Sequence, residues 1–130
     1  MFKPKSAFSG FSVDDLAKAK EFYTKVLGLK VDDGFGGVRL HLPGGGTVWV
    51  YPKDAHQPAT FTILNFEVDD IDAAVDELTN RGVQFEHYED GPKTDERGIF
   101  RGRQQKMGPD IAWFKDPAGN FLSVIEVSKI

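Results

Sequence analysis

Cysteine is the most informative absence from this sequence, because none occurs among its 130 residues. Without cysteine, the chain has no thiol nucleophile, no zinc–thiolate site and no thiol redox motif, and its composition fits a reducing compartment. The residues after Met1–Ser6 contain no apolar run long enough for a signal peptide or a membrane span. We therefore expect a cytoplasmic protein that has no membrane partner and whose chemistry depends on other side chains.

An excess of positive charge is also missing. The sequence has 16 basic and 20 acidic residues, which gives a formal net charge of −4. Proteins that bind nucleic acids or anionic membranes usually carry clustered positive charge. We therefore expect no nucleic-acid partner, and a neutral or cationic small molecule is easier to accommodate.

What the sequence does contain is an internal repeat. Residues 11–16 read Phe-Ser-Val-Asp-Asp-Leu, and residues 66–71, which lie 55 positions later, read Phe-Glu-Val-Asp-Asp-Ile. Each copy begins with the alternation typical of a strand, continues with an apolar pattern of helical period and ends near a glycine, Gly28 or Gly82. Two copies predict one α+β domain over residues 1–130, made of two tandem β-α-β-β-β modules over about residues 7–54 and 60–130.

The other elements follow from segments rich in β-branched and aromatic residues between turn residues. Strands are expected over residues 8–13, 29–31, 37–42, 47–51, 61–68, 83–88, 111–114 and 120–127, and helices over 14–27 and 69–81. The segment from Glu89 to Asp110 has no counterpart in the first module. We interpret residues 89–110 as an inserted loop, which forms either a lid or interface or simply a solvated, mobile surface segment.

Several stretches of the sequence carry a family resemblance. They are the two repeats, Phe22-Tyr23, Val-Leu-Gly-Leu at 26–29, Gly82-Val83 and Phe-Lys-Asp-Pro-Ala-Gly-Asn at 114–120. Together they resemble the vicinal oxygen chelate superfamily, which includes glyoxalases, extradiol dioxygenases, fosfomycin-modifying enzymes and bleomycin-binding resistance proteins. The resemblance implies that the two modules form an open, barrel-like cup with the helices outside and a ligand cavity inside. It also implies a homodimer, the common assembly of the superfamily.

The resemblance further implies where a metal ion would be bound. In enzymes of this superfamily, the first strand of each module carries a His or Gln ligand and the fourth strand carries a Glu. Carried onto this sequence, the four positions are Phe8, Trp49, Ile63 and Ser123. First-row metal ions need converging nitrogen, oxygen or sulfur donors, which phenyl, indole and sec-butyl groups do not supply. We therefore expect no metal, no cofactor and no catalytic residue at these positions.

The same strands predict a hydrophobic ligand site. Because side chains alternate along a strand, the aromatic and aliphatic groups of the first and fourth strands share the inner face of the cup with small polar residues. The third strand also borders the cavity in members of the superfamily, so the resemblance implies that His41 offers a hydrogen bond to a ligand. The predicted ligand-binding residues are Phe8, Gly10, Ser12, His41, Trp49, Tyr51, Ile63, Asn65 and Ser123.

The function that fits these residues is metal-independent binding of a small aromatic or heterocyclic molecule, neutral or cationic. One alternative is a metal-dependent, glyoxalase-like lyase or an extradiol-type dioxygenase whose ligands lie elsewhere, for instance His41 and His87 with a carboxylate. A second alternative is an interaction module without a ligand, because strand aromatic residues often form only core. In that case Phe8 and Ile63 pack together and fill the cup.

Overall fold

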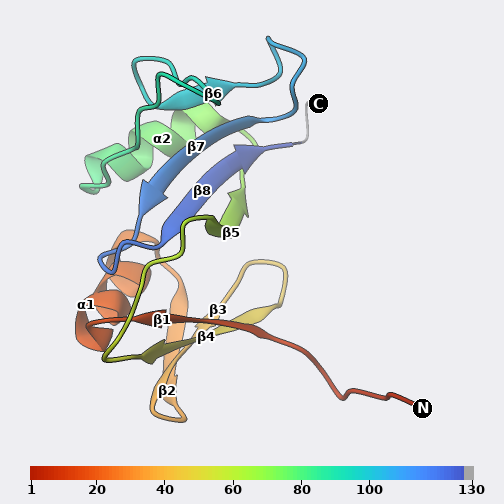
Figure 1. Ribbon diagram of the computed structural model, residues 1–130, viewed down its shortest axis with the longest axis vertical. Helices are drawn as coiled ribbons and strands as arrows, with labels where there is room; N and C mark the ends of the chain where they lie inside the picture. The colour runs from red at the N-terminus through yellow and green to blue at the C-terminus, as the bar shows by residue number, and fades with distance from the viewer. Residues whose placement is uncertain (128–130) are drawn as a thin grey trace. The chain divides into compact units, whose positions relative to one another are not determined.

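The computed structural model describes residues 1–127 and divides into two compact units, Met1–Pro58 and Ala59–Ile130 (Figure 1). Each unit has a helix and a four-stranded mixed sheet, as expected for the α+β fold with two β-α-β-β-β modules. No helix within the described residues is long and apolar enough to cross a membrane.

In the first unit, the sheet has the strand order β1-β4-β3-β2. Its elements are β1 (Ser9–Val13), α1 (Leu16–Glu21), a π-helical turn (Phe22–Val26), β2 (Lys30–Gly34), β3 (Gly37–His41) and β4 (Thr47–Pro52). β1 pairs with β4 in parallel, and the other pairs are antiparallel. The sequence predicts a single helix to Gly28, but the helical period changes at Phe22. The chain then leaves the helix through Gly28, which has a φ of 71°.

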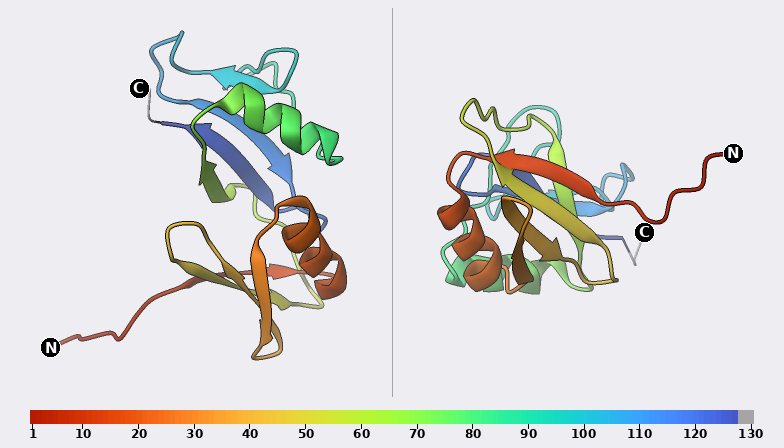
Figure 2. Two further views of the ribbon diagram at one scale, coloured as in Figure 1. Left: turned by 180° about the vertical axis from the view of Figure 1, so that it is seen from behind. Right: turned by 90° about the horizontal axis from the view of Figure 1, so that it is seen from below.

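The second unit repeats this arrangement with the strand order β5-β8-β7-β6. Its elements are β5 (Thr62–Glu67), α2 (Ile71–Asn80), β6 (Ile99–Arg101), β7 (Asp110–Lys115) and β8 (Phe121–Glu126). The first and last strands, β5 and β8, are again parallel. Two further views show α2 lying along one face of this sheet (Figure 2). The repeated pairing explains how two similar sequences give two similar units.

The Val-Asp-Asp repeat starts both helices in the same way. Asp15 accepts a hydrogen bond from the backbone N–H of Lys18, and Asp70 accepts one from Ala73, both at 3.1 Å. These side chains satisfy backbone donors that have no partner in the first turn of a helix. The second aspartate of each repeat is therefore an N-cap, which ends the strand and begins the helix.

The edge strand of the second sheet differs from the expectation. Residues 83–88 form no regular strand and contribute one isolated bridge, between Phe85 and Phe114. Ile99 of β6 then pairs with Ala112, which lies only two residues before Phe114 in β7. The edge is thus made of two short pieces, and the chain between them forms a loop. The expected inserted loop over 89–110 is therefore wrong in its second half, where β6 lies, because a three-residue strand is too short for its period to be read from sequence.

Gly98 lies at the base of this loop and packs against Phe85 and Glu86 in the first piece of the edge strand. Its φ is 84°, and a Cβ there would lie 2.9 Å from both the carbonyl oxygen of Glu86 and the Cβ of Phe85. Gly91, in the same loop, also has a positive φ of 69°, but no atom lies near its missing Cβ. The two glycines thus share a backbone conformation and differ in packing.

Gly98→Ala should destabilise the protein more than Gly91→Ala. Both substitutions carry the cost of a left-handed backbone, about 1–2 kcal/mol, and only Gly98→Ala adds an overpacking cost of about 1–3 kcal/mol. Urea denaturation of the two variants measures the difference. Equal losses of unfolding free energy would contradict the close packing at Gly98.

Candidate functional site

In the first unit, one face of the sheet packs on the helical segment and the other carries most of the predicted site. Phe11 of β1 contacts Tyr23, with ring centroids 6.0 Å apart, so alternate residues face the helical segment. Val13, Leu40 and Val50 belong to the same buried face. The opposite face carries five of the predicted residues: Gly10, Ser12, His41, Trp49 and Tyr51. Phe8 precedes β1 and is 64% exposed, so it packs into no core.

Trp49 and Tyr51 form an aromatic stack on this face. Their ring centroids are 4.6 Å apart, and the angle between the ring planes is 29°. A Cβ on Gly10 would lie 3.8 Å from Trp49 Cε3, whereas a Cβ on Gly37 would lie 2.8 Å from Trp49 Nε1. The indole therefore extends from Gly10 in β1 to Gly37 in β3, over strand positions that have no side chain. Gly37 was not predicted, although a glycine inside a strand is itself a signal of close approach.

The indole N–H has no hydrogen-bond partner. Trp49 Nε1 is buried, and no acceptor within the described residues lies in hydrogen-bonding range of it. A buried donor without a partner costs about 1–3 kcal/mol, and the N–H of a buried tryptophan usually finds an acceptor. This side chain is therefore held in place by packing alone.

Two polar residues of the same face are held by hydrogen bonds. His41 Nε2 lies 2.7 Å from Asp32 Oδ2, and this hydrogen bond is the main reason why the pKa of Asp32 is lowered. Ser12 Oγ lies 2.7 Å from Nδ1 of His56, a pairing that the sequence did not predict. Both polar groups of the predicted site thus have protein partners within the first unit.

The remaining predicted residues lie in the second unit. Ser123 Oγ donates a hydrogen bond to Asn65 Oδ1 at 2.6 Å. Ile63 is half-buried beside an irregularity in the pairing of β5. Trp113 pairs across the strands with Ser123, and its ring lies 6.4 Å from Phe100. Trp113 was missed, although it lies two residues after Ile111 in a predicted strand and therefore on the same face.

The two units match position by position. Gly10 pairs with Trp49 in β1 and β4, and Asn65 pairs with Ser123 in β5 and β8. Since Gly10 and Asn65 are 55 residues apart, like the two repeats, Trp49 and Ser123 occupy equivalent positions. The pairing thus shows that the two positions are equivalent in the repeat, and their assignment from the family pattern stays a prediction.

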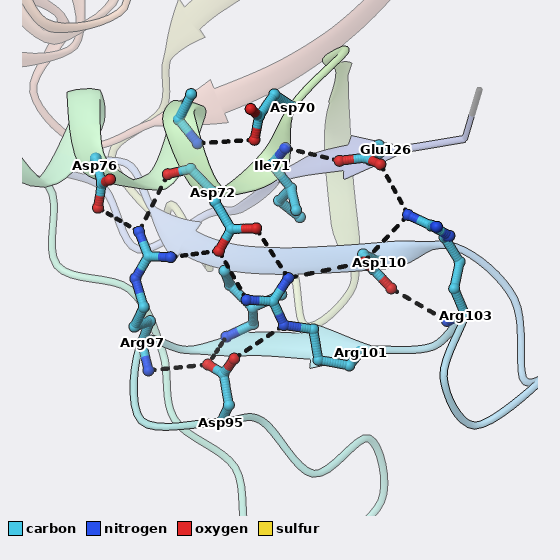
Figure 3. A network of polar contacts seen from close by, with 12 residues as sticks. Asp70, Ile71, Asp72, Asp76, Asp95, Arg97, Arg101, Arg103, Asp110 and Glu126 are labelled. Carbon is cyan, nitrogen blue, oxygen red and sulfur yellow. Dashed lines mark hydrogen bonds and ion pairs between the residues drawn. The ribbon is translucent and has the colours of Figure 1, made fainter. Parts of the chain in front are cut away.

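An ion-pair network joins α2 to the loop before β6 (Figure 3). Arg101 donates two hydrogen bonds to Asp72, at 2.7 and 3.2 Å, and one to Asp95, at 3.1 Å. Arg97 pairs with Asp72 and Asp76. The hydrogen bond from Arg101 is the main reason why the pKa of Asp72 is lowered. These contacts fix the loop to the helix, which argues against a solvated, mobile segment at 95–101.

The same network borders an open cleft of about 810 Å³. Arg103 lies on its wall and pairs with the buried Glu126 at 3.0 Å. Glu126 also accepts a hydrogen bond from the backbone N–H of Ile71, at 2.8 Å. Most charged groups of this cleft are thus already paired with one another, and we interpret them as structural.

Comparisons with known proteins decide the family. The model of the glyoxalase/bleomycin resistance protein/dioxygenase superfamily matches residues 8–124. The chain belongs to this superfamily. Comparison with curated protein sequences finds no match.

Solved structures of the superfamily share the fold. TnmS3, an antibiotic binding protein from a Streptomyces species, is 27% identical and has a TM-score of 0.62, over 98% of this chain and all of that one. A superfamily member from Sphaerobacter thermophilus is 27% identical with a TM-score of 0.65, over 95% and 98% of the two chains. The fosfomycin resistance protein FosX from Mesorhizobium loti is only 14% identical, with a TM-score of 0.63 over 98% and 95%, and shows the fold alone.

The residue types do not fit the metal site of superfamily enzymes. The equivalent positions on β4 and β8 carry an indole, at Trp49, and a hydroxyl that is bonded to Asn65, at Ser123. Within residues 1–127, no group of three or more His, Cys, Asp or Glu side chains is arranged to hold a metal ion. We therefore derive no chemical step through a metal.

Asp72→Asn should lower stability at neutral pH and reduce its loss in acid. A carboxylate whose folded pKa is lowered stabilises the fold above its ordinary pKa, and this contribution disappears as the pH falls below about 4. Because Asp72 is half-exposed, the loss at pH 7 should be a few tenths to about 1 kcal/mol. Urea denaturation between pH 7 and about pH 3 measures it. Asp90→Asn is the control, and the same dependence on pH in both variants would refute the role of Asp72.

Proposed function

We propose that this protein binds a planar aromatic or heterocyclic small molecule without a metal ion. The observation that carries the proposal is the Trp49–Tyr51 stack, on the sheet face that the helical segment does not cover. Stacking on such rings adds about 0.5–1.5 kcal/mol to the free energy of burial. Gly10 and Gly37 leave no side chain at the strand positions under the two ends of the indole.

The polar groups of this face are already bonded to protein partners, His41 to Asp32 and Ser12 to His56. The contact between Ser12 and His56 has the length of a nucleophile–base pair, so the preference for binding rests on the aromatic stack and not on these groups. The antibiotic-binding function named for TnmS3, a relative of similar length, supports the same class of function. Contributions of Ile63, Asn65 and Ser123 to the ligand site stay predictions.

Trp49→Ala should weaken the binding of planar aromatic compounds more than tenfold. Loss of the indole removes both the stacking energy, about 0.5–1.5 kcal/mol, and the burial of its apolar surface against the ligand, and about 1.4 kcal/mol corresponds to a tenfold change in affinity. Titration calorimetry with a panel of fused-ring compounds measures the effect. Circular dichroism checks that the variant is folded like the wild type. Trp113→Phe is the control, because Trp113 lies in the second unit. Unchanged affinity in Trp49→Ala would move the site away from this face.

We also propose that the protein is a homodimer, as the superfamily resemblance implies. Large aromatic side chains near the starts of β1 and β5 support this proposal, since Phe8 and Phe61 are 64% and 68% exposed. Sedimentation velocity should give twice the monomer mass of 14.5 kDa. Phe8→Ser should shift the equilibrium towards monomer. A monomer over the whole accessible concentration range would refute the dimer.

A further inference from the structure

We propose that the ligand of the Trp49 site is an aromatic carboxylate, whose ring stacks on Trp49 and whose carboxylate is bound by Arg39. The inference rests on the proposed function and adds the charge of the ligand and the residue that recognises it. Nothing in the superfamily match specifies either of them.

The first step is the position of Arg39. In the antiparallel pairing of β3 with β4, Arg39 lies directly opposite Trp49. Residues that pair in this way point to the same face of the sheet, with their Cβ atoms about 4.5–5.5 Å apart. Gly10 is the partner of Trp49 on its other side and offers no side chain. Arg39 therefore has the longest polar side chain beside the aromatic stack.

The guanidinium of Arg39 is not bonded to any carboxylate within the described residues. The chain has five arginines, all within residues 1–127, and the other four are ion-paired. Their carboxylate partners are Glu77, Asp72, Asp76, Asp95, Asp110 and Glu126. Among the residues that the structure describes, no hydrogen bond or ion pair of the Arg39 side chain is found, although its charge is one of the smaller causes of the lowered pKa of Asp32. The five N–H donors of Arg39 remain available to a ligand.

The nearest acid to Arg39 is already in use. Asp32 of β2 is the cross-strand partner of Arg39, but its carboxylate is hydrogen-bonded to His41. Asp32 is thus hydrogen-bonded to the histidine, and it interacts with the neighbouring Arg39 only through its charge. Lys30, which pairs with His41 in the register of β2 and β3, adds a second positive charge.

The local charge of this face therefore differs from that of the whole chain. The net charge of −4 favoured a neutral or cationic guest, but the face around Trp49 carries Lys30 and Arg39 against the single acid Asp32. A ligand responds to the charges nearest to it, because salt screens more distant ones within about 8–10 Å. A planar guanidinium matches a carboxylate through two parallel hydrogen bonds. Together with the stack, this geometry selects an aromatic acid.

The test compares two ligands of the same shape, naphthoate and its neutral amide, naphthamide. The background is Trp113→Phe, so that fluorescence quenching reports Trp49 alone, and calorimetry confirms the affinities. Naphthoate should bind about tenfold more tightly than naphthamide, the effect of charge-assisted hydrogen bonds. Arg39→Gln should abolish the preference for naphthoate over naphthamide, and Arg39→Lys should retain only part of it. Arg81→Gln, which removes an arginine paired with Glu77 in the second unit, should leave the preference unchanged.

The outcomes separate this inference from the proposed function. If both compounds bind in a Trp49-dependent manner with equal affinity, or if Arg39→Gln keeps the preference, the aromatic site stands and the role of Arg39 is overturned. Tighter binding of the cationic analogue naphthylmethylammonium than of naphthoate would also overturn it. If none of the three compounds binds, both the proposed function and this inference fail.

Discussion

The parallel pairing of the first strand with the last strand of each unit is the constraint on which the rest of the structure depends. It brings together residues about 40 to 60 positions apart, such as Gly10 with Trp49 and Asn65 with Ser123. A shift of this pairing by one residue would turn every side chain of a strand to the opposite face. Trp49 would then point into the layer occupied by Val48 and Val50, and the aromatic face would not exist. The register thus determines both the core and the candidate site.

Much of the order of strands and helices could be read from the sequence because the information was local and repeated. The second aspartate of each repeat caps a helix, at Asp15 and Asp70, and the alternation before it gives the strand. The edge of the second sheet could not be read in this way. Its two pieces, at Phe85 and Ile99, become neighbours only because Gly98 packs against Phe85 and because β7 pairs with both. Such pairing depends on contacts across the sheet, which no pattern along the chain contains.

The same distinction between local pattern and contacts across the sheet applies to the candidate site. Alternation, together with the strand positions that the family resemblance implies, was enough to place Gly10, Trp49 and Tyr51 on one face. The partners of those residues were not predictable. Gly37 lies under the indole and Arg39 beside it because β3 pairs with β4 in one register. The hydrogen bond between Ser12 and His56 spans a loop whose path the sequence does not determine.

Two features of this face are not explained by stability. The N–H of Trp49 is buried without a hydrogen bond, which destabilises the folded state, and a less polar aromatic residue would avoid that cost. Within residues 1–127 the Arg39 side chain makes no ion pair, whereas the other four arginines fix α2, the loop before β6 and the last strand through carboxylates. Arginines that support the fold of this protein are thus paired, and the one that is not lies opposite the unsatisfied indole. Groups that contribute little to folding, gathered beside a stacked aromatic pair, are what a ligand-binding surface requires.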